Sequence, residues 1–170
     1  VMLGGPRRDE QIENMIETVR NIARAGIPIF GYDWLPSKVW RTPDKLIRGG
    51  ARATAFNYEI ANEMPLTHGR ECTEEEMWAN LEYWIKAIAP VAEEEGIKIG
   101  IHPCDPPVKQ LGGIPMLFNS YDNYRRYLDI VPSDNIGIEF CQGTISEMFD
   151  SEGDALYEFI AEMVQKKKVL

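Results

Sequence analysis

Cysteine is scarce in this sequence, and long apolar runs are absent. The 170 residues include three cysteines, at positions 72, 104 and 141, and an odd, scattered set of this kind does not indicate a disulfide framework. No run approaches the roughly 18 apolar residues of a membrane-spanning helix. Residues 1–15 lack the charged-then-apolar pattern of a signal peptide. We therefore expect a cytoplasmic protein in a reducing compartment, without a membrane partner.

Positive charge is also in short supply. The formal net charge is −9, and the sequence pI is about 4.8. A nucleic-acid-binding protein needs a basic face for the phosphates, so no nucleic-acid partner is expected. An anionic small molecule is not excluded, because a local pocket can oppose the global charge.

Patterns typical of strands and helices alternate along the chain. Apolar residues at three- and four-residue steps predict a helix from Asp9, its expected N-cap, to Arg24. A capping box of Thr73 and Glu76 begins a second helix, which ends near Gly96. Further helices are predicted at residues 120–130, capped by Ser120, and at 154–165, and buried strands at 27–32, 97–101 and 136–140.

This alternation implies an α/β fold with parallel strands and right-handed crossovers, here a (β/α) barrel of the TIM type. Such a barrel needs about 250 residues. Val1–Gly4 has the pattern of the end of one strand, and Val169–Leu170 that of the start of another. We therefore expect one domain over residues 1–170 that forms a partial barrel, an interior slice of a longer one.

The periodicity fails in one long segment, residues 33–71, which is rich in glycine, proline and aromatic residues. Some alternation at residues 51–58 would suit a short hairpin. A long irregular segment inside a compact domain is usually functional. We expect this one to act as a lid that closes over a substrate.

Two strand ends carry residues suited to chemistry, as expected where functional groups gather in parallel α/β folds. His102 offers an imidazole and Cys141 a thiolate, which suit divalent Mn, Fe or Zn. A strand-end histidine is about as often a satisfied polar residue, and a strand cysteine is usually a small buried hydrophobe. The spacing is neither CxxC nor HExxH. From the pattern alone, a metal site and ordinary structural roles for the two residues therefore both stay open.

Carboxylates near these strand ends suggest support for the histidine. Asp105 and Glu139 are candidates for orienting His102 through a hydrogen bond. For Asp105, a turn role before Pro106 is an equally good interpretation.

Arginines in the long segment suggest a site for an acidic ligand. Arg41, Arg48 and Arg52 can each hold a carboxylate with two parallel hydrogen bonds, although solvated loop charge is the plainer interpretation for any one of them. We take Arg52, Tyr32 at the end of the first strand, and Asp105 as candidate substrate-binding residues. No residue is assigned as the catalytic acid or base.

Several stretches of the sequence together resemble the D-mannonate dehydratase family, within the xylose-isomerase-like TIM barrels. They are RRDEQIENM, AGIPIFGYDWLP, TEEEMWANLEYWIKAIAPVAEEEGIKIGIHP, DPP, LGGIP and VPSDNIGIEFCQGTISEM. The resemblance runs nearly from end to end. The combination of IHPxDPP with FCQG is its most specific part.

The resemblance implies an activity and a metal. The family dehydrates D-mannonate, a small sugar acid, to 2-keto-3-deoxy-D-gluconate with Mn²⁺ or Fe²⁺, and His102 and Cys141 fall where it has metal ligands. A homo-oligomer is expected. The sequence departs from the family's HPDDPP pattern at Cys104, and the family's further His ligand and Asp-His pair belong to strands that would lie beyond Leu170.

Two other functions remain open at this point. A related metal-dependent sugar isomerase or epimerase would share the metal and interconvert substrates without losing water. An inactive fragment or a non-catalytic binding protein would fit the absence of the later strands.

Overall fold

The centre of the molecule is a parallel sheet. The computed structural model describes residues 1–37, 39–148 and 153–170. Three strands, β1 (Ile29–Tyr32), β4 (Lys98–Ile101) and β7 (Ile136–Ile138), lie in the order β1-β4-β7. Both pairings are parallel, with Gly31 beside Gly100 and Gly100 beside Gly137. Val169 adds a parallel bridge to Ile138, on the side of β7 away from β4.

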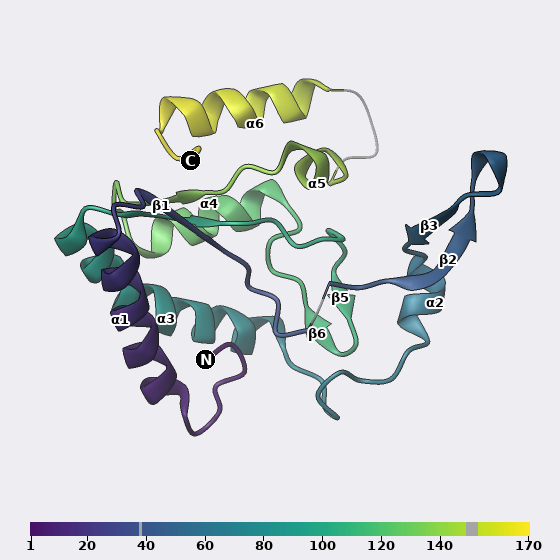
Figure 1. Ribbon diagram of the computed structural model, residues 1–170, viewed down its shortest axis with the longest axis horizontal. Helices are drawn as coiled ribbons and strands as arrows, with labels where there is room; N and C mark the ends of the chain where they lie inside the picture. The colour runs from purple at the N-terminus through teal and green to yellow at the C-terminus, as the bar shows by residue number, and fades with distance from the viewer. Residues whose placement is uncertain (38, 149–152) are drawn as a thin grey trace.

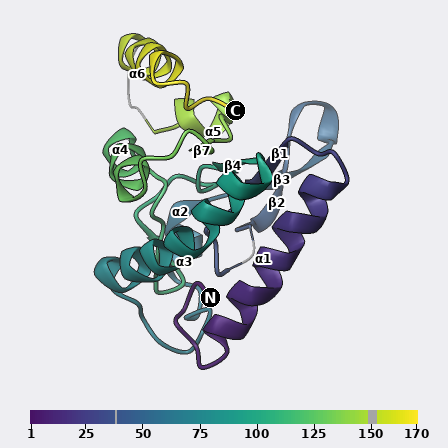
Figure 2. The same cartoon turned by 90° about the vertical axis from the view of Figure 1, so that its left-hand side faces the viewer.

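Long helices cover one face of this sheet, and short helices lie in the connections. The long ones are α1 (Arg8–Arg24), α3 (Glu74–Glu95), α4 (Tyr121–Ile130) and α6 (Asp154–Gln165), and the short ones are α2 (Tyr58–Asn62) and α5 (Gln142–Ser146). Figure 2 shows the four long helices in sequence order around the sheet, with α1 packed beside α3. The isoleucines of β4 and β7 that meet the helices are at most 1% exposed, and burial stabilises each by about 1.5–3 kcal/mol.

The predicted fold class is confirmed at the level of a parallel α/β architecture. A partial parallel sheet is what the described ranges contain, and they do not close into a barrel. Within the same ranges, no helix is both long and apolar enough to cross a membrane.

Helix boundaries agree closely with the capping signals in the sequence. The Thr73 hydroxyl accepts a hydrogen bond from the Glu76 backbone N–H at 3.1 Å, and Gly96 ends α3 in the left-handed conformation. The Ser120 hydroxyl caps α4 in the same way. The prediction of Asp9 as an N-cap was wrong, because α1 begins at Arg8 and Asp9 lies in its first turn. There its negative charge interacts favourably with the helix dipole.

The first strand and the first residues depart from expectation. Residues 27–32 were predicted as a buried strand, yet Ile27 and Ile29 are 49% and 44% exposed. The reason is that β1 has only β4 beside it within the described chain, and Ile29 points away from the helices. Val1–Gly4 is a turn closed by a hydrogen bond from the Gly4 N–H to the Val1 carbonyl, not a strand.

The segment of residues 33–71 contains regular structure. Strands β2 (Thr42–Leu46) and β3 (Arg52–Ala55) form an antiparallel hairpin that stands away from the sheet, with α2 beneath it (Figure 1). The end of the segment is tied to a small hairpin of β5 (Gln110–Leu111) and β6 (Ile114–Pro115). There the Thr67 and Cys72 N–H groups donate to the carbonyls of Gly112 and Gly113.

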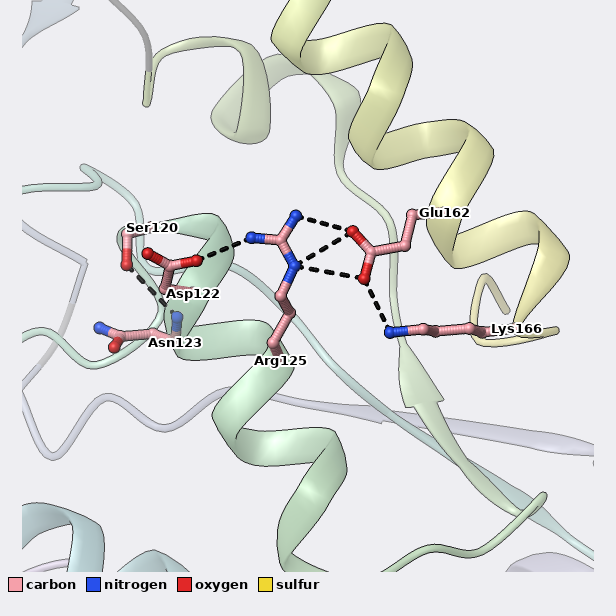
Figure 3. A network of polar contacts seen from close by, with 6 residues as sticks. All are labelled: Ser120, Asp122, Asn123, Arg125, Glu162 and Lys166. Carbon is pink, nitrogen blue, oxygen red and sulfur yellow. Dashed lines mark hydrogen bonds and ion pairs between the residues drawn. The ribbon is translucent and has the colours of Figure 1, made fainter.

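An ion network joins α4 to α6, as Figure 3 shows. The Arg125 guanidinium donates to both carboxylate oxygens of Glu162, at 2.7–3.2 Å, and to Asp122 at 2.7 Å. Lys166 donates to Glu162 at 2.7 Å. The hydrogen bonds from Arg125, then from Lys166, lower the pKa of Glu162 from 4.5 to about 2.

The Glu162 network predicts an acid-sensitive contribution to stability. Replacing Glu162 with Gln (Glu162→Gln) should lower the free energy of unfolding by about 0.5–1 kcal/mol at pH 7, since solvent screens this partly exposed group. Because folding lowers the pKa of Glu162, this contribution is complete above pH 4.5 and is lost as the pH falls toward about 2. Urea unfolding at several pH values measures it. Glu158→Gln, on the exposed side of the same helix, is the control, and equal losses in both variants would contradict the prediction.

Candidate metal and substrate site

Strand register decides which side chains share a face of the sheet. Tyr32, Ile101 and Ile138 lie side by side across β1, β4 and β7. The Tyr32 ring packs on Trp84 of α3 with centroids 4.5 Å apart, so this row faces the helices. Because side chains alternate along a strand, the residues on either side of this row face the opposite way.

Three glycines in register line the face away from the helices. Gly31, Gly100 and Gly137 are neighbours across the three strands. A Cβ atom on Gly137 would lie 2.7 Å from the Lys168 carbonyl oxygen, and one on Gly31 would overlap with the Glu139 carboxylate. The absence of side chains in this row therefore gives the Glu139 side chain room to reach across the sheet to β1.

One residue further along, the strand ends bring polar side chains together. The ladder continues through hydrogen bonds from the His102 N–H to the Tyr32 carbonyl and from the Glu139 N–H to the Ile101 carbonyl. Asp33, His102 and Glu139 thus follow three adjacent strands at their carboxyl ends. This edge is where functional groups of parallel α/β folds gather.

The imidazole of His102 is fixed through one of its nitrogens. Nδ1 lies 2.8 Å from the Pro103 carbonyl oxygen and 3.4 Å from Asp33 Oδ1. Both neighbours are acceptors, so Nδ1 carries the proton in the neutral ring and Nε2 keeps a free lone pair. Desolvation lowers the pKa of His102, but the Pro103 carbonyl, Cys141 and Asp33 together outweigh it, and the pKa is raised overall.

Cys141 lies beside His102 and has an activated thiol. Its Sγ is 3.5 Å from the Thr144 hydroxyl. Hydrogen bonds from the Thr144 side chain and backbone lower the pKa of Cys141; burial opposes them, and His102 adds to the lowering. The structure therefore brings together the two residues that the sequence singled out as candidate metal ligands, an imidazole and a thiol of lowered pKa.

The side chains of the three candidate substrate-binding residues make no hydrogen bond or ion pair with His102 or Cys141. The Tyr32 hydroxyl is 2.8 Å from that of Tyr127, and burial raises its pKa well above the ordinary value, so its polar end lies on the helix side. Arg52 lies on the projecting hairpin, 3.5 Å from Asp44. For the Asp105 side chain, no hydrogen bond or ion pair is found with any other described residue.

The carboxylate that contacts His102 is Asp33, and sequence reasoning missed it in this role. Asp105 and Glu139 were expected to orient the imidazole, but Glu139 reaches toward Gly31 instead. Asp33 follows the strand beside His102, and that adjacency was the available signal. It could be used only once β1 was known to pair with β4.

The donor set fits half of a transition-metal site. Neutral imidazole and thiolate are ligands for Mn, Fe or Zn, and a carboxylate behind the histidine fixes the ring orientation. Across the described ranges, no group of three or more His, Cys, Asp or Glu side chains is placed to hold a metal ion. His102 and Cys141 would thus supply two ligands, and a complete site needs further ones.

The three cysteines should differ sharply in reactivity. Cys141 has a lowered pKa and partial exposure, whereas burial raises the pKa of Cys72 and raises that of Cys104 to about 12. Iodoacetamide at neutral pH should therefore modify Cys141 first, as peptide mass spectrometry can measure. His102→Ala and Thr144→Val should each slow this reaction by raising the pKa of Cys141. Faster labelling of Cys104 than of Cys141 would contradict the assignment.

Comparisons with known proteins identify relatives of the whole described fold. The chain superimposes on the crystal structure of mannonate dehydratase from Streptococcus suis serotype 2 with a TM-score of 0.82 and 32% identity, over 99% of this chain and 49% of that one. A crystal structure of a putative sugar phosphate isomerase/epimerase from Anabaena variabilis matches with a TM-score of 0.62 and 14% identity, covering 98% and 45%. At that identity the second match shows a shared fold alone.

Curated sequences and a family model give the same result. The chain is 33% identical to a mannonate dehydratase of Streptococcus pneumoniae, over 90% of this chain and 48% of that protein. Against a mannonate dehydratase of Streptococcus suis it is 32% identical, with the same coverage. The chain thus spans about half the length of these relatives. The family model described as D-mannonate dehydratase (UxuA) matches residues 1–65 and 63–166. The chain therefore belongs to the D-mannonate dehydratase family.

Proposed function

We propose that this chain carries the His-Cys half of the metal site of a mannonate dehydratase, which converts D-mannonate to 2-keto-3-deoxy-D-gluconate. The observation that carries the proposal is the meeting of His102 and Cys141 at the ends of β4 and β7, with mutual effects on their pKa values. Membership of the family supports the choice of substrate. Since the relatives are about twice as long as the matched region, we expect the remaining ligands and the acid/base pair in that additional length.

Each residue of the site has a distinct part in this proposal. His102 Nε2 and Cys141 Sγ would hold Mn²⁺ or Fe²⁺, which polarises oxygen atoms of the sugar acid. Asp33 and the Pro103 carbonyl hold the Nδ1 proton, so that Nε2 stays available. Thr144 lies 3.5 Å from the Cys141 sulfur and lowers the pKa of its thiol.

Contacts to the sugar acid are a further part of the proposal. Arg52 and Asp105 remain predicted substrate contacts, while the hydroxyl of Tyr32 is engaged with Tyr127 and would act through packing. The lid role of residues 33–71 and the cytoplasmic location stay predictions.

Metal binding by the chain itself tests the ligand assignment. With Co²⁺ as a spectroscopic probe, the wild-type chain should show thiolate-to-metal charge-transfer absorption, because Cys141 is a ligand. His102→Ala and Cys141→Ala should abolish it, whereas Cys72→Ala should not. Asp33→Asn should weaken Co²⁺ binding about 10- to 100-fold by releasing the imidazole. Asp129→Asn, an exposed change on α4, is the control. Charge-transfer absorption that survives in Cys141→Ala would overturn the assignment.

Product analysis tests the reaction. We expect a chimera that joins residues 1–166 to the remaining length of the Streptococcus suis relative to convert D-mannonate with Mn²⁺ into a compound with a methylene beside a ketone, visible by NMR. His102→Ala in the chimera should lower kcat/KM by at least about 100-fold. A product that keeps every hydroxyl group would instead indicate an isomerase or epimerase, and no product would exclude dehydration by this site.

A further inference from the structure

The hydroxyl of Tyr124 is a buried polar group without a hydrogen-bond partner. Tyr124 lies on α4 and is 0% exposed, and its hydroxyl finds no donor or acceptor among the residues that the structure describes. Buried polar groups nearly always have a partner, because burial removes the hydrogen bonds that water would make. An exception of this kind calls for a functional explanation.

A second tyrosine of the same helix shows the ordinary arrangement. Tyr127, three positions further along α4, is equally buried, and its hydroxyl lies 2.8 Å from that of Tyr32. Both tyrosines of α4 pack on the ring of Phe118, each at a centroid distance of 5.3 Å. Packing therefore explains an aromatic ring at both positions, but at Tyr124 it does not explain the hydroxyl.

The Tyr124 ring is linked by contacts to both strand ends that carry the candidate ligands. It packs on Phe118, whose carbonyl accepts a hydrogen bond from the Cys104 N–H at 3.0 Å, two residues after His102 at the end of β4. It also packs on Phe159 at 5.8 Å, and the Phe159 ring stacks on the residue before Cys141 at the end of β7. These contacts place Tyr124 beside the ends of β4 and β7.

Two thiols lie within electrostatic reach of the Tyr124 hydroxyl. Burial raises the pKa of Tyr124, and negative charge on Cys104 or Cys141 raises it further, so the hydroxyl stays protonated at neutral pH and can donate. The two sulfurs differ as acceptors. Burial raises the pKa of Cys104 to about 12, so Cys104 stays a neutral thiol, whereas the pKa of Cys141 is lowered. Because an ionised acceptor binds a hydrogen more strongly than a neutral one, Cys141 is the better partner.

We propose that Tyr124 is a positioning residue whose hydroxyl donates a hydrogen bond to the Cys141 sulfur when that sulfur is a metal-bound thiolate. Because Cys141 must be a ligand for this to occur, the role of Tyr124 rests on the proposed function. The acceptor is created by loss of the thiol proton, which metal binding brings about. This accounts for a hydroxyl that has no partner as long as Cys141 is a neutral thiol. The Thr144 hydroxyl, 3.5 Å from the same sulfur, would be a second partner on the thiolate.

The energy of the Co²⁺ charge-transfer band tests this role on the intact chain. A hydrogen bond to the sulfur stabilises its lone pairs, so removing the bond should move the band to longer wavelength. Tyr124→Phe, which deletes only the hydroxyl, should show this shift and should raise the Co²⁺ Kd about tenfold. Tyr127→Phe is the matched control, because it removes a buried hydroxyl of the same helix whose partner is Tyr32, and it should leave the band in place.

Thermal unfolding without added metal separates positioning from an ordinary structural role. Tyr127→Phe loses a buried hydrogen bond, so its Tm should fall by about 2–4 °C. Tyr124→Phe removes a hydroxyl that has no partner, so its Tm should stay the same or rise. A lower Tm for Tyr124→Phe would show that the hydroxyl already has a partner in the fold and would overturn the inference.

A second background identifies the sulfur that accepts the bond. In Cys104→Ala, adding Tyr124→Phe should still shift the band, because Cys141 is the acceptor. Loss of the shift in that background would assign the hydroxyl to Cys104 and overturn the inference. A band that Tyr124→Phe leaves unchanged and Cys141→Ala abolishes would contradict the role of Tyr124 alone. A wild type without any band would overturn the ligand assignment, and the role of Tyr124 with it.

Discussion

The parallel register of β1, β4 and β7 is the constraint on which the rest of the structure depends. It places Tyr32, Ile101 and Ile138 against the helices and puts three glycines on the opposite face. Since side chains alternate along a strand, a slip of one residue would turn the glycines toward the helices and the isoleucines toward open space. Burial of the isoleucines therefore fixes where the strands end, and with that the row of Asp33, His102 and Glu139.

The chemistry of the site follows from this register, from the acceptors beside His102 Nδ1, and from the contact of Thr144 with Cys141. Asp33 reaches His102 because β1 and β4 are neighbours and end together. The Pro103 carbonyl and Asp33 keep a proton on one ring nitrogen, and Thr144 favours the thiolate of Cys141. The two proposed ligands are therefore positioned by residues within three positions along the chain or on the next strand.

The long segment after β1 shows how much a pattern-based interpretation can leave out. The periodicity fails over most of residues 33–71, and the alternation at residues 51–58 was the one sign of a hairpin. The structure contains that hairpin, with its first strand at Thr42–Leu46, and a short helix at Tyr58–Asn62. The end of the segment is fixed by backbone hydrogen bonds from Thr67 and Cys72 to the β5–β6 hairpin, a contact between distant parts of the chain.

The sequence by itself determined the alternation of strands and helices, the caps at Thr73, Gly96 and Ser120, and the candidates His102 and Cys141. These features depend on residues only a few positions apart, so they can be predicted from the sequence alone. Only the tertiary structure decided that Tyr32 faces the helices, that Ile29 is exposed at an edge, and that Asp33 lies beside His102. Each of these depends on which strands are adjacent and in what register. The pattern of a single strand defines two faces but does not say which one is buried. That is decided by which strands pair and in what register.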